Sequence, residues 1–527
     1  MRDMRRQSFL QGAMLLTITG LINKALGAIY LIPLTRLIGA EGIGLYQMAY
    51  SVYGTILVVS SSGLPIAISK LVSERLARGE ETNALRVFRV SLIFLLVTGI
   101  AFSVFLSLGA STIARRFLGD PRSYYTVKNI APAVFLVAVM SAFRGYFQGR
   151  QIMLPTALSQ LSEQVVRVSL ALFLAYILLP RGVEFSAAGS AMGAVGGAFA
   201  GLLVLIAIYI YERAGKRPAL SSHIDSNEDY LSILGELVSF AIPLTIGSLI
   251  APLGDLANAA IIPARLRLSG KSMAEATALY GQLSAMGMSL IALPTVFTTA
   301  FATSLVPIIS ASMSKGNLAG ARARAREAIR FTLIIALPAF VGLRELAWPI
   351  CDLLFGCREA GNPLSVLAAG VIFLCLQQTI SGLLHGLGMP LVTARNLLIG
   401  IGTGAGLNYY LAGIPGLGIR GAAFGTITGF AIVAFFNFAA AAQVLGDILD
   451  IASALRVTAI SLILGPLIRY AYGFLLLILP SSSLATIACI FMTIPIYLMA
   501  LLLIREVTVD ECRRLPYAGW IINRILR

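Results

Sequence analysis

Apolar segments long enough to cross a lipid bilayer follow one another along this chain from Phe9 to Ile504. A bilayer's hydrocarbon core is about 30 Å thick, so a helix that rises 1.5 Å per residue crosses it with roughly 20 apolar residues. Only helices and closed barrels satisfy every backbone polar group in lipid, and continuous rather than alternating apolar runs favour helices. The sequence therefore predicts an all-α polytopic membrane protein.

About fourteen transmembrane helices are expected. Their approximate bounds are 9–34, 45–68, 88–110, 129–149, 155–179, 187–211, 233–262, 280–311, 329–347, 363–386, 391–412, 418–443, 455–479 and 483–504. Basic residues concentrate in the links that lie on the same side of the membrane as the amino terminus. Such an excess of lysine and arginine marks the cytoplasmic face. We therefore expect a multi-pass membrane protein with both termini in the cytoplasm.

Composition excludes several other classes of protein. The chain is 58% hydrophobic and only 12% charged, which is incompatible with a disordered or an ordinary soluble protein. Its net charge of +16 is explained by topology and anionic lipid rather than by nucleic acid. Two histidines and five scattered cysteines give no metal-ligand spacing, and no paired acidic motif indicates an enzyme. We expect no cofactor, apart from Na⁺ or H⁺ as a coupling ion.

An internal repeat divides the chain. The same 237 residues separate Gly79 from Gly316, Gly145 from Gly382, and Gly149 from Gly386. Six spans preserve orientation, so the repeat predicts two pseudo-symmetric six-helix lobes related by an axis along the membrane normal. The expected parts are an N-terminal lobe (1–211), a cytoplasmic linker (212–230), a C-terminal lobe (231–445), and two extra helices with a basic cytoplasmic tail (446–527). Such a plan is typical of alternating access, with the substrate between the lobes near mid-depth.

Polar residues inside the spans are the first candidates for a site, because an ionised side chain at mid-bilayer costs about 2.5–3.5 kcal/mol on insertion scales. Lys24, with Asn23 beside it, lies deep in the first span and either lines a cavity or snorkels to the surface. Glu163 and Arg167 are one turn apart in the fifth span and form either a structural pair or a substrate or proton site. Asp255 is a candidate ligand for a coupling cation, or a hydrogen-bonding group at the interface.

Further arginines are expected near the ends of spans. Arg144, Arg150 and Arg395 are placed at cytoplasmic ends, and Arg36 and Arg420 near outer ends. Each alone is most simply an interfacial anchor, but as a set they suit an anionic substrate, because guanidinium groups bind phosphate bidentately. Arg469 lies near mid-depth in the thirteenth span, outside the two lobes, where it would line a separate groove.

Several segments resemble a known family. They are "NKALGAIYLIPLTRLIGAEGIGLYQMAYSVY" (23–53), "GLPIAISKLVSE" (63–74), "FRGYFQGRQIMLPTALSQLSEQVVRV" (143–168), "LPTVFTTAFATSLVPIIS" (293–310) and "QQTISGLLHGLGMP" (377–390). The chain is similar over nearly its whole length to the stage V sporulation protein B family. These proteins are polysaccharide-biosynthesis exporters of the multidrug/oligosaccharidyl-lipid/polysaccharide superfamily. It more distantly resembles MurJ-type lipid II flippases.

The resemblance implies a MATE-like fold and a bacterial cell membrane as the location. It also implies a flippase that moves a lipid-linked cell-wall precursor from the inner to the outer leaflet, in wall growth or sporulation. It implies that Lys24 meets a pyrophosphate and that the last two helices hold a polyprenyl tail. The expected partners are a polyprenyl-pyrophosphate-linked glycan, membrane lipids and the cell-wall synthesis machinery, with the protein itself a monomer. Two alternatives stay open: a cation-coupled multidrug exporter of the same superfamily, and a membrane scaffold that transports nothing.

Overall fold

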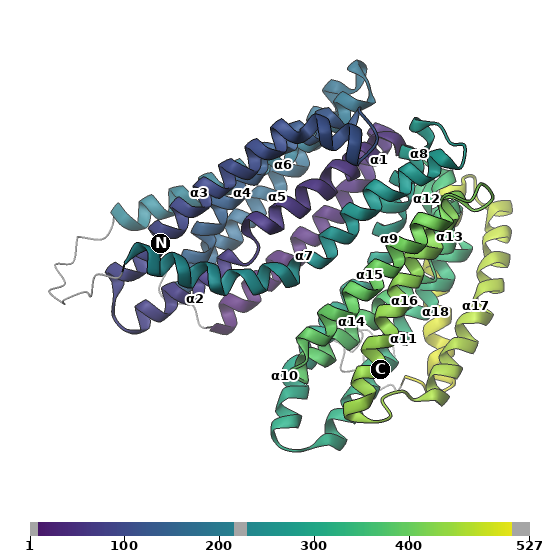
Figure 1. Cartoon of the computed structure of the whole chain (residues 1–527). Helices are drawn as coiled ribbons and strands as arrows, with labels where there is room; N and C mark the ends of the chain where they lie inside the picture. Colours follow the sequence, from purple (N-terminus) through teal and green to yellow (C-terminus); the bar gives the residue numbers. More distant parts are fainter. Residues whose placement is uncertain (1–8, 215–228, 508–527) are drawn as a thin grey trace. The chain divides into compact units, whose positions relative to one another are not determined.

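The computed structural model describes residues 9–214 and 229–507, which are predominantly helical and contain no strand. Packing divides the chain into two compact units, the first ending at Gly281 and the second beginning at Gln282 (Figure 1). The first unit contains α1 (Phe9–Ser61), α2 (Leu64–Ala77), α3 (Glu81–Thr112), η1 (Ile113–Phe117), α4 (Ser123–Gly149), α5 (Leu154–Leu178), η2 (Leu179–Arg181), α6 (Val183–Ala214), α7 (Tyr230–Leu268) and α8 (Met273–Gly281).

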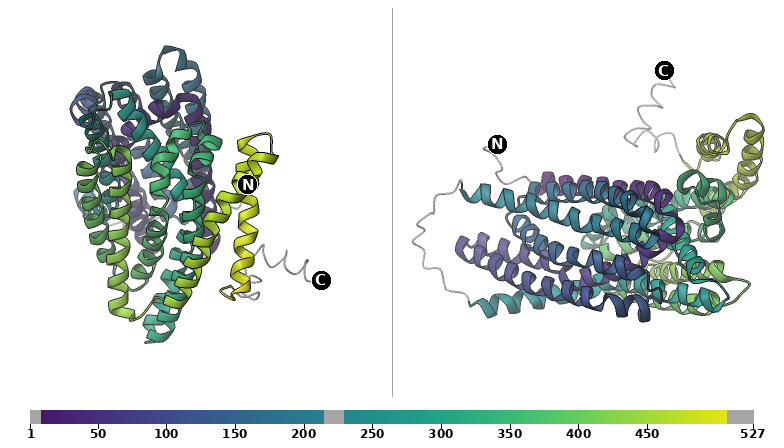
Figure 2. Two further views of the ribbon diagram at one scale, coloured as in Figure 1. Left: turned by 90° about the vertical axis from the view of Figure 1, so that its right-hand side faces the viewer. Right: turned by 90° about the horizontal axis from the view of Figure 1, so that it is seen from above.

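The second unit holds the remaining helices. They are η3 (Gln282–Gly287), α9 (Met288–Ala292), α10 (Thr295–Ser314), α11 (Leu318–Glu345), α12 (Ala347–Phe355), η4 (Arg358–Ala360), α13 (Gly361–Leu367), α14 (Gly370–Gly386), α15 (Pro390–Leu411), α16 (Gly418–Leu445), α17 (Ile451–Ile478) and α18 (Ser482–Leu503). Figure 2 shows the yellow helices α17 and α18 along one side of this unit.

The predicted all-α membrane architecture is confirmed. Ten of the described helical segments are long and apolar enough to cross a membrane, or up to twelve when each of two sharply bent pairs counts as one span. This count takes residues 14–77 as a single segment, although α1 is kinked at Gly39, which has a φ of 71° and a ψ of 179°. The kink separates the first two spans expected from the sequence.

Three predicted spans are less regular than expected. The tenth, 363–386, is bent by 53° between α13 and α14. The second, 45–68, crosses a break at Ser62 and Gly63, where α1 ends and α2 begins. The eighth, 280–311, is interrupted by the π-helix η3 and by a turn at Leu293 and Pro294. Proline lacks the N–H donor that would continue the preceding helix, which explains why α9 does not extend through Pro294.

The internal repeat has a structural counterpart. Gly79 and Gly316 both have positive φ, 81° and 67°, a conformation that glycine adopts at little cost. A Cβ on Gly145 would lie 2.9 Å from the carbonyl oxygen of Pro65 on α2, and one on Gly382 would lie 2.4 Å from that of Ala302 on α10. The glycines spaced 237 residues apart therefore allow equivalent close helix packing in the two units.

The boundary between the two compact units differs from the lobe boundary expected from the internal repeat. The sequence put the lobe boundary at the linker 212–230, most of which lies outside the described residues. Helices α7 and α8, which follow this linker, contact α1 in the first unit, and α7 also contacts α2 and α3. The hydroxyl group of Thr55 donates to the carbonyl oxygen of Pro252 on α7 at 3.1 Å. The packing boundary thus follows α8 instead of preceding α7.

A row of glycines fixes α6 against α5. Cβ atoms placed on Gly193 and Gly197 would lie 2.6 Å and 2.5 Å from the carbonyl oxygens of Arg167 and Glu163. Small residues at four-residue spacing let membrane helices approach closely. The segment "GSAMGAVGG" therefore packs against the same turns of α5 that carry the charged pair expected from the sequence.

Candidate functional site

A polar pocket of about 310 Å³ lies in the first unit. Its lining comes from both halves of the kinked helix α1 and from α5: Asn23, Gly27, Tyr30, Leu31, Tyr46, Gln47, Tyr50, Gln164 and Arg167. Hydroxyl, amide and guanidinium groups predominate in this set. Such groups offer many hydrogen-bond donors, so the pocket suits a ligand rich in acceptor oxygens.

The kink of α1 builds the tyrosine side of the pocket. In a straight helix, Tyr30 and Tyr46 would be about 24 Å apart along the axis. Because the chain turns at Gly39, their phenolic oxygens are 2.8 Å apart and share a hydrogen bond. The ring of Tyr50 stacks on that of Tyr46 at a centroid distance of 5.5 Å. One glycine conformation thereby brings together side chains from two predicted spans.

The charged part of the site is a triad rather than the predicted pair. Glu163 on α5 binds Arg167 through one carboxylate oxygen and Arg144 of α4 through the other at 2.8 Å. Arg144 also donates to the hydroxyl of Ser159 at 3.0 Å. The Glu163 side chain is only 12% exposed. One carboxylate thus holds two guanidinium groups, and the triad keeps one net positive charge.

Several polar atoms of this region lack a partner. Among the described residues, Asn23 Oδ1, Arg144 Nε and Arg167 Nε are buried without a hydrogen-bond partner. Buried polar groups in folded proteins are almost always hydrogen-bonded, and an unmet one costs about 1–3 kcal/mol. The site therefore has unused capacity to bind a ligand or water.

Lys24 lies next to this pocket in the chain but does not line it. Its side chain is exposed, and within residues 9–214 and 229–507 its ammonium group has neither an ion-pair nor a hydrogen-bond partner. The side chain of its neighbour Asn23 points into the pocket instead. That Lys24 meets a substrate stays a prediction.

The other predicted site residues are dispersed. Arg36 and Asp255 are exposed, on α1 and α7 of the first unit. Arg395 of α15, in the second unit, donates to the side-chain oxygen of its neighbour Asn396 at 3.3 Å. Arg420 and Arg469 were expected in two separate places but line one pocket of the second unit. In the described part of the chain, no three histidine, cysteine, aspartate or glutamate side chains gather to hold a metal ion.

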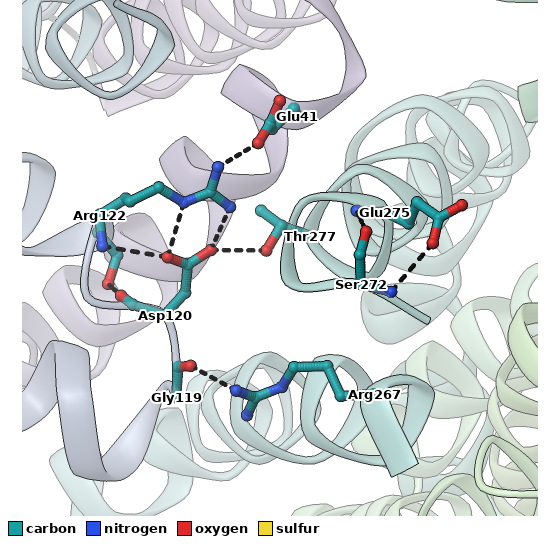
Figure 3. A network of polar contacts seen from close by, with 9 residues as sticks. Glu41, Gly119, Asp120, Arg122, Arg267, Ser272, Glu275 and Thr277 are labelled. Atoms are coloured by element: carbon teal, nitrogen blue, oxygen red, sulfur yellow. Dashed lines mark hydrogen bonds and ion pairs between the residues drawn. The ribbon is translucent and has the colours of Figure 1, made fainter. Parts of the chain in front are cut away.

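Sequence reasoning missed a polar network in the first unit (Figure 3). Asp120 accepts hydrogen bonds from the Arg122 side chain at 3.0 and 2.7 Å and from Thr277 of α8 at 2.8 Å. Arg122 also binds Glu41 of α1. Burial by itself would raise the pKa of Asp120, but the bonds from Arg122 and Thr277 outweigh it and hold that pKa below its ordinary value. The same bond to Asp120 raises the pKa of the Arg122 guanidinium.

Comparison with known proteins gives these features a family context. The model of the polysaccharide biosynthesis protein family matches residues 9–313. The chain is 32% identical to stage V sporulation protein B of Bacillus subtilis (strain 168), over 99% of this chain and 100% of that protein. It is 29% identical to the lipid II flippase MurJ of the same organism, over 74% of this chain and 75% of that protein.

Solved structures share the fold. An inward-facing multidrug resistance MATE family transporter of the MOP superfamily superposes with a TM-score of 0.66 at 16% identity, over 82% of this chain and 98% of that one. Lipid II flippase MurJ in an inward closed conformation superposes with a TM-score of 0.62 at 15% identity, over 94% and 99%. The match of the family model to more than half of the chain, together with the full-length relative, shows that this chain belongs to the polysaccharide biosynthesis protein family of multi-pass membrane proteins.

Proposed function

We propose that this protein is a flippase that moves a lipid-linked cell-wall or polysaccharide precursor, with a pyrophosphate head group, from the inner to the outer leaflet. The triad of Arg144, Glu163 and Arg167 carries the proposal. Two guanidinium groups share one carboxylate, so the site keeps a net positive charge. Guanidinium groups are well suited to bidentate binding of phosphate oxygens, and Arg167, the member of the triad that lines the pocket, would bind a pyrophosphate there.

The rest of the pocket supports a glycan close to that charge. Tyr30, Tyr46 and Tyr50 contribute hydroxyl groups and ring faces, and Gln47 and Gln164 contribute amides. Sugars present both hydroxyl groups and apolar faces, so these side chains match their chemistry. With a volume of about 310 Å³, the pocket suits the pyrophosphate with its adjoining sugar, and the rest of a larger head group would lie outside it.

A reconstitution experiment tests the proposal. The purified protein in liposomes should make a fluorescent lipid II analogue in the inner leaflet accessible to a quencher added outside. Replacing Arg167 with Gln should abolish this movement without loss of protein from the liposomes. Movement of the analogue at the rate of empty liposomes would refute the proposal.

The alternative function, a cation-coupled drug exporter of the same superfamily, would require a site that prefers cationic substrates. A cationic drug would meet a net positive triad, and like charges repel each other in a poorly solvated site. The same liposomes loaded with a cationic dye should therefore show no protein-dependent efflux. Dye efflux without lipid movement would favour the exporter.

A further inference from the structure

The second unit contains a larger pocket, of about 1160 Å³, that the proposed function does not use. Its charged and aromatic lining comes from α11, α12, η4, α16 and α17. Four arginines line it: Arg344, Arg358, Arg420 and Arg469. They are far apart in the sequence, yet the fold of one unit brings them to one cavity.

Only half of the positive charge in this pocket is balanced by acidic side chains. The acidic side chains in its lining are Glu345 and Asp352, so two of the four positive charges have no counterpart. Arg420 donates to the side-chain oxygen of Asn362 at 3.4 Å. Within the described chain, the other three guanidinium groups form no ion pair and no hydrogen bond. Four exposed arginines, of which only Arg420 has a hydrogen-bond partner in the described chain, form a site for an anion.

The depth of Arg469 indicates that this anion belongs to a lipid. Arg469 lies nine residues before Ile478, where α17 ends, which corresponds to about 14 Å of helix. An arginine at such a depth in an apolar span is costly unless it faces protein or water. One turn earlier, a Cβ on Gly465 would lie 3.3 Å from Val341 of α11. The close packing of α17 on α11 thus encloses the inner end of the pocket.

The neighbouring surface of α17 suits hydrocarbon chains. The side chain of Ile463 is 71% exposed, and that of Leu477 is 85% exposed. Leu462, Leu467 and Phe474 are exposed on the same helix. These residues belong to a segment apolar enough to cross a membrane. Leu476 lines the pocket and is itself exposed, so the charged pocket reaches the apolar surface of this helix.

We propose that this pocket binds the phosphate-bearing head group of an anionic lipid, whose hydrocarbon chains lie along α17. The proposal does not depend on the transport proposed above, because it concerns a different unit and is tested by binding alone. Arg344, Arg358, Arg420 and Arg469 would hold the phosphate oxygens. Trp348 and Tyr472, which also line the pocket, would pack against the glycerol or sugar next to the phosphate.

Trp348 provides a local reporter of binding. The chain contains two tryptophans, Trp348 and Trp520, so the Trp520→Phe variant leaves Trp348 as the only indole. In detergent micelles, phosphatidylglycerol with brominated acyl chains should quench this fluorescence more strongly than brominated phosphatidylcholine at the same mole fraction. Equal quenching by the two lipids would overturn the proposal.

Two substitutions, one that removes a positive charge and one that removes a negative charge, test whether electrostatic attraction causes the lipid binding. In the Trp520→Phe background, Arg469→Gln should weaken the apparent affinity for phosphatidylglycerol about tenfold, which corresponds to about 1.4 kcal/mol. Glu345→Gln should strengthen it, a change that loss of folding cannot produce. Arg115→Gln removes an exposed arginine of the first unit and should leave the affinity unchanged. An Arg469→Gln variant with the affinity of its parent would contradict the assignment.

Competition distinguishes the sources of the phosphate. Unbrominated polyprenyl pyrophosphate and unbrominated phosphatidylglycerol should each relieve the quenching. Greater potency of the polyprenyl lipid would identify a transported or released carrier lipid as the occupant, and equal potency would identify bulk anionic lipid. Relief by inorganic pyrophosphate at the same concentrations would show a soluble anion site and overturn the lipid assignment.

Discussion

The hydroxyl group of Thr277 donates a 2.8 Å hydrogen bond to Asp120, and this bond attaches helix α8 to the turn that precedes helix α4 (Figure 3). Nearby, Arg267 at the end of α7 donates to the carbonyl oxygen of Gly119 at 2.8 Å. Helices α7 and α8 are therefore fastened to the same turn by two separate bonds. The network explains why these helices pack with the first unit although they follow the linker.

Loss of the Asp120 carboxylate should destabilise this attachment. The Asp120→Asn variant is expected to lower the free energy of unfolding by about 1.5–3 kcal/mol, because hydrogen bonds to a buried charge are lost. The Thr277→Val variant should cost less, about 1 kcal/mol. Thermal melting in detergent at neutral pH measures both changes. The control is Glu275→Gln, which alters a fully exposed carboxylate on α8, the helix of Thr277. An equal loss of unfolding free energy in all three variants would contradict the role of Asp120.

The same carboxylate should make stability depend on pH. Hydrogen bonds hold the pKa of Asp120 below its ordinary value of 3.8. Its stabilising contribution is therefore complete above the ordinary pKa and is lost as the pH falls through the lowered one. The difference in melting temperature between the wild type and Asp120→Asn should shrink over that acidic range. A difference that stays constant down to the lowest pH at which the protein melts would exclude this linkage.

Substitutions in the triad should separate folding from transport. Glu163→Gln leaves Arg144 and Arg167 without their shared carboxylate, and breaking a buried ion pair costs about 3–5 kcal/mol. Arg167→Gln leaves the Arg144–Glu163 pair intact, so it should melt close to the wild type but lose lipid movement. Melting and the liposome assay are measured on the same preparations. An Arg167→Gln variant with wild-type transport would remove the triad from the site.

The role of Lys24 should be visible in cells. Its side chain is exposed and has no partner in the described structure, so Lys24→Ala should change stability by no more than about 0.5 kcal/mol. We expect it to abolish complementation of a flippase-deficient strain while membrane abundance is unchanged. Lys24→Arg, which keeps the charge, should retain part of the function. Normal growth with Lys24→Ala would show that this residue does not meet the substrate.

Replacement of Gly39 should disturb the pocket through the backbone. With φ of 71° and ψ of 179°, Gly39 occupies a region that is essentially restricted to glycine and costs other residues about 1–3 kcal/mol. A Cβ there would meet no atom within 4 Å, so the cost of Gly39→Ala would be conformational. Gly39→Asn should not be milder, because asparagine tolerates the left-handed helical region rather than this one. Melting of both variants, with Gly20→Ala in regular helix as the control, measures the effect.

The sequence was sufficient for the fold class because the length of an apolar run is a local property, and the glycine spacing of the repeat can be counted along the chain. Gly145 and Gly382 marked the repeat, and both prove to lie at equivalent helix crossings. The break after Ser61 and the turn at Pro294 were not predicted, because the hydrophobic runs continue through them. Hydropathy records how apolar a segment is and not whether its helix is continuous.

The site was only partly predictable. The four-residue spacing of Glu163 and Arg167 predicted their pairing on one helix face, which the structure confirms. The third member, Arg144, comes from another helix, and no local pattern reports such a contact. Tyr30 was missed because its approach to Tyr46 depends on the kink at Gly39. The spacing of Tyr46, Tyr50 and Tyr53 was the available signal, since it places three tyrosines on one face of a helix.

The glycine row of α6 has a consequence for how the triad can change. Gly193 and Gly197 lie directly against the carbonyl groups of Arg167 and Glu163, and backbones in such close contact leave no room for one helix to slide past the other. The two helices must then tilt or turn together as one rigid pair. Any rearrangement that releases Glu163 from its arginines has to come from the α4 side, through Arg144, or from rotation of side chains within a backbone that stays fixed.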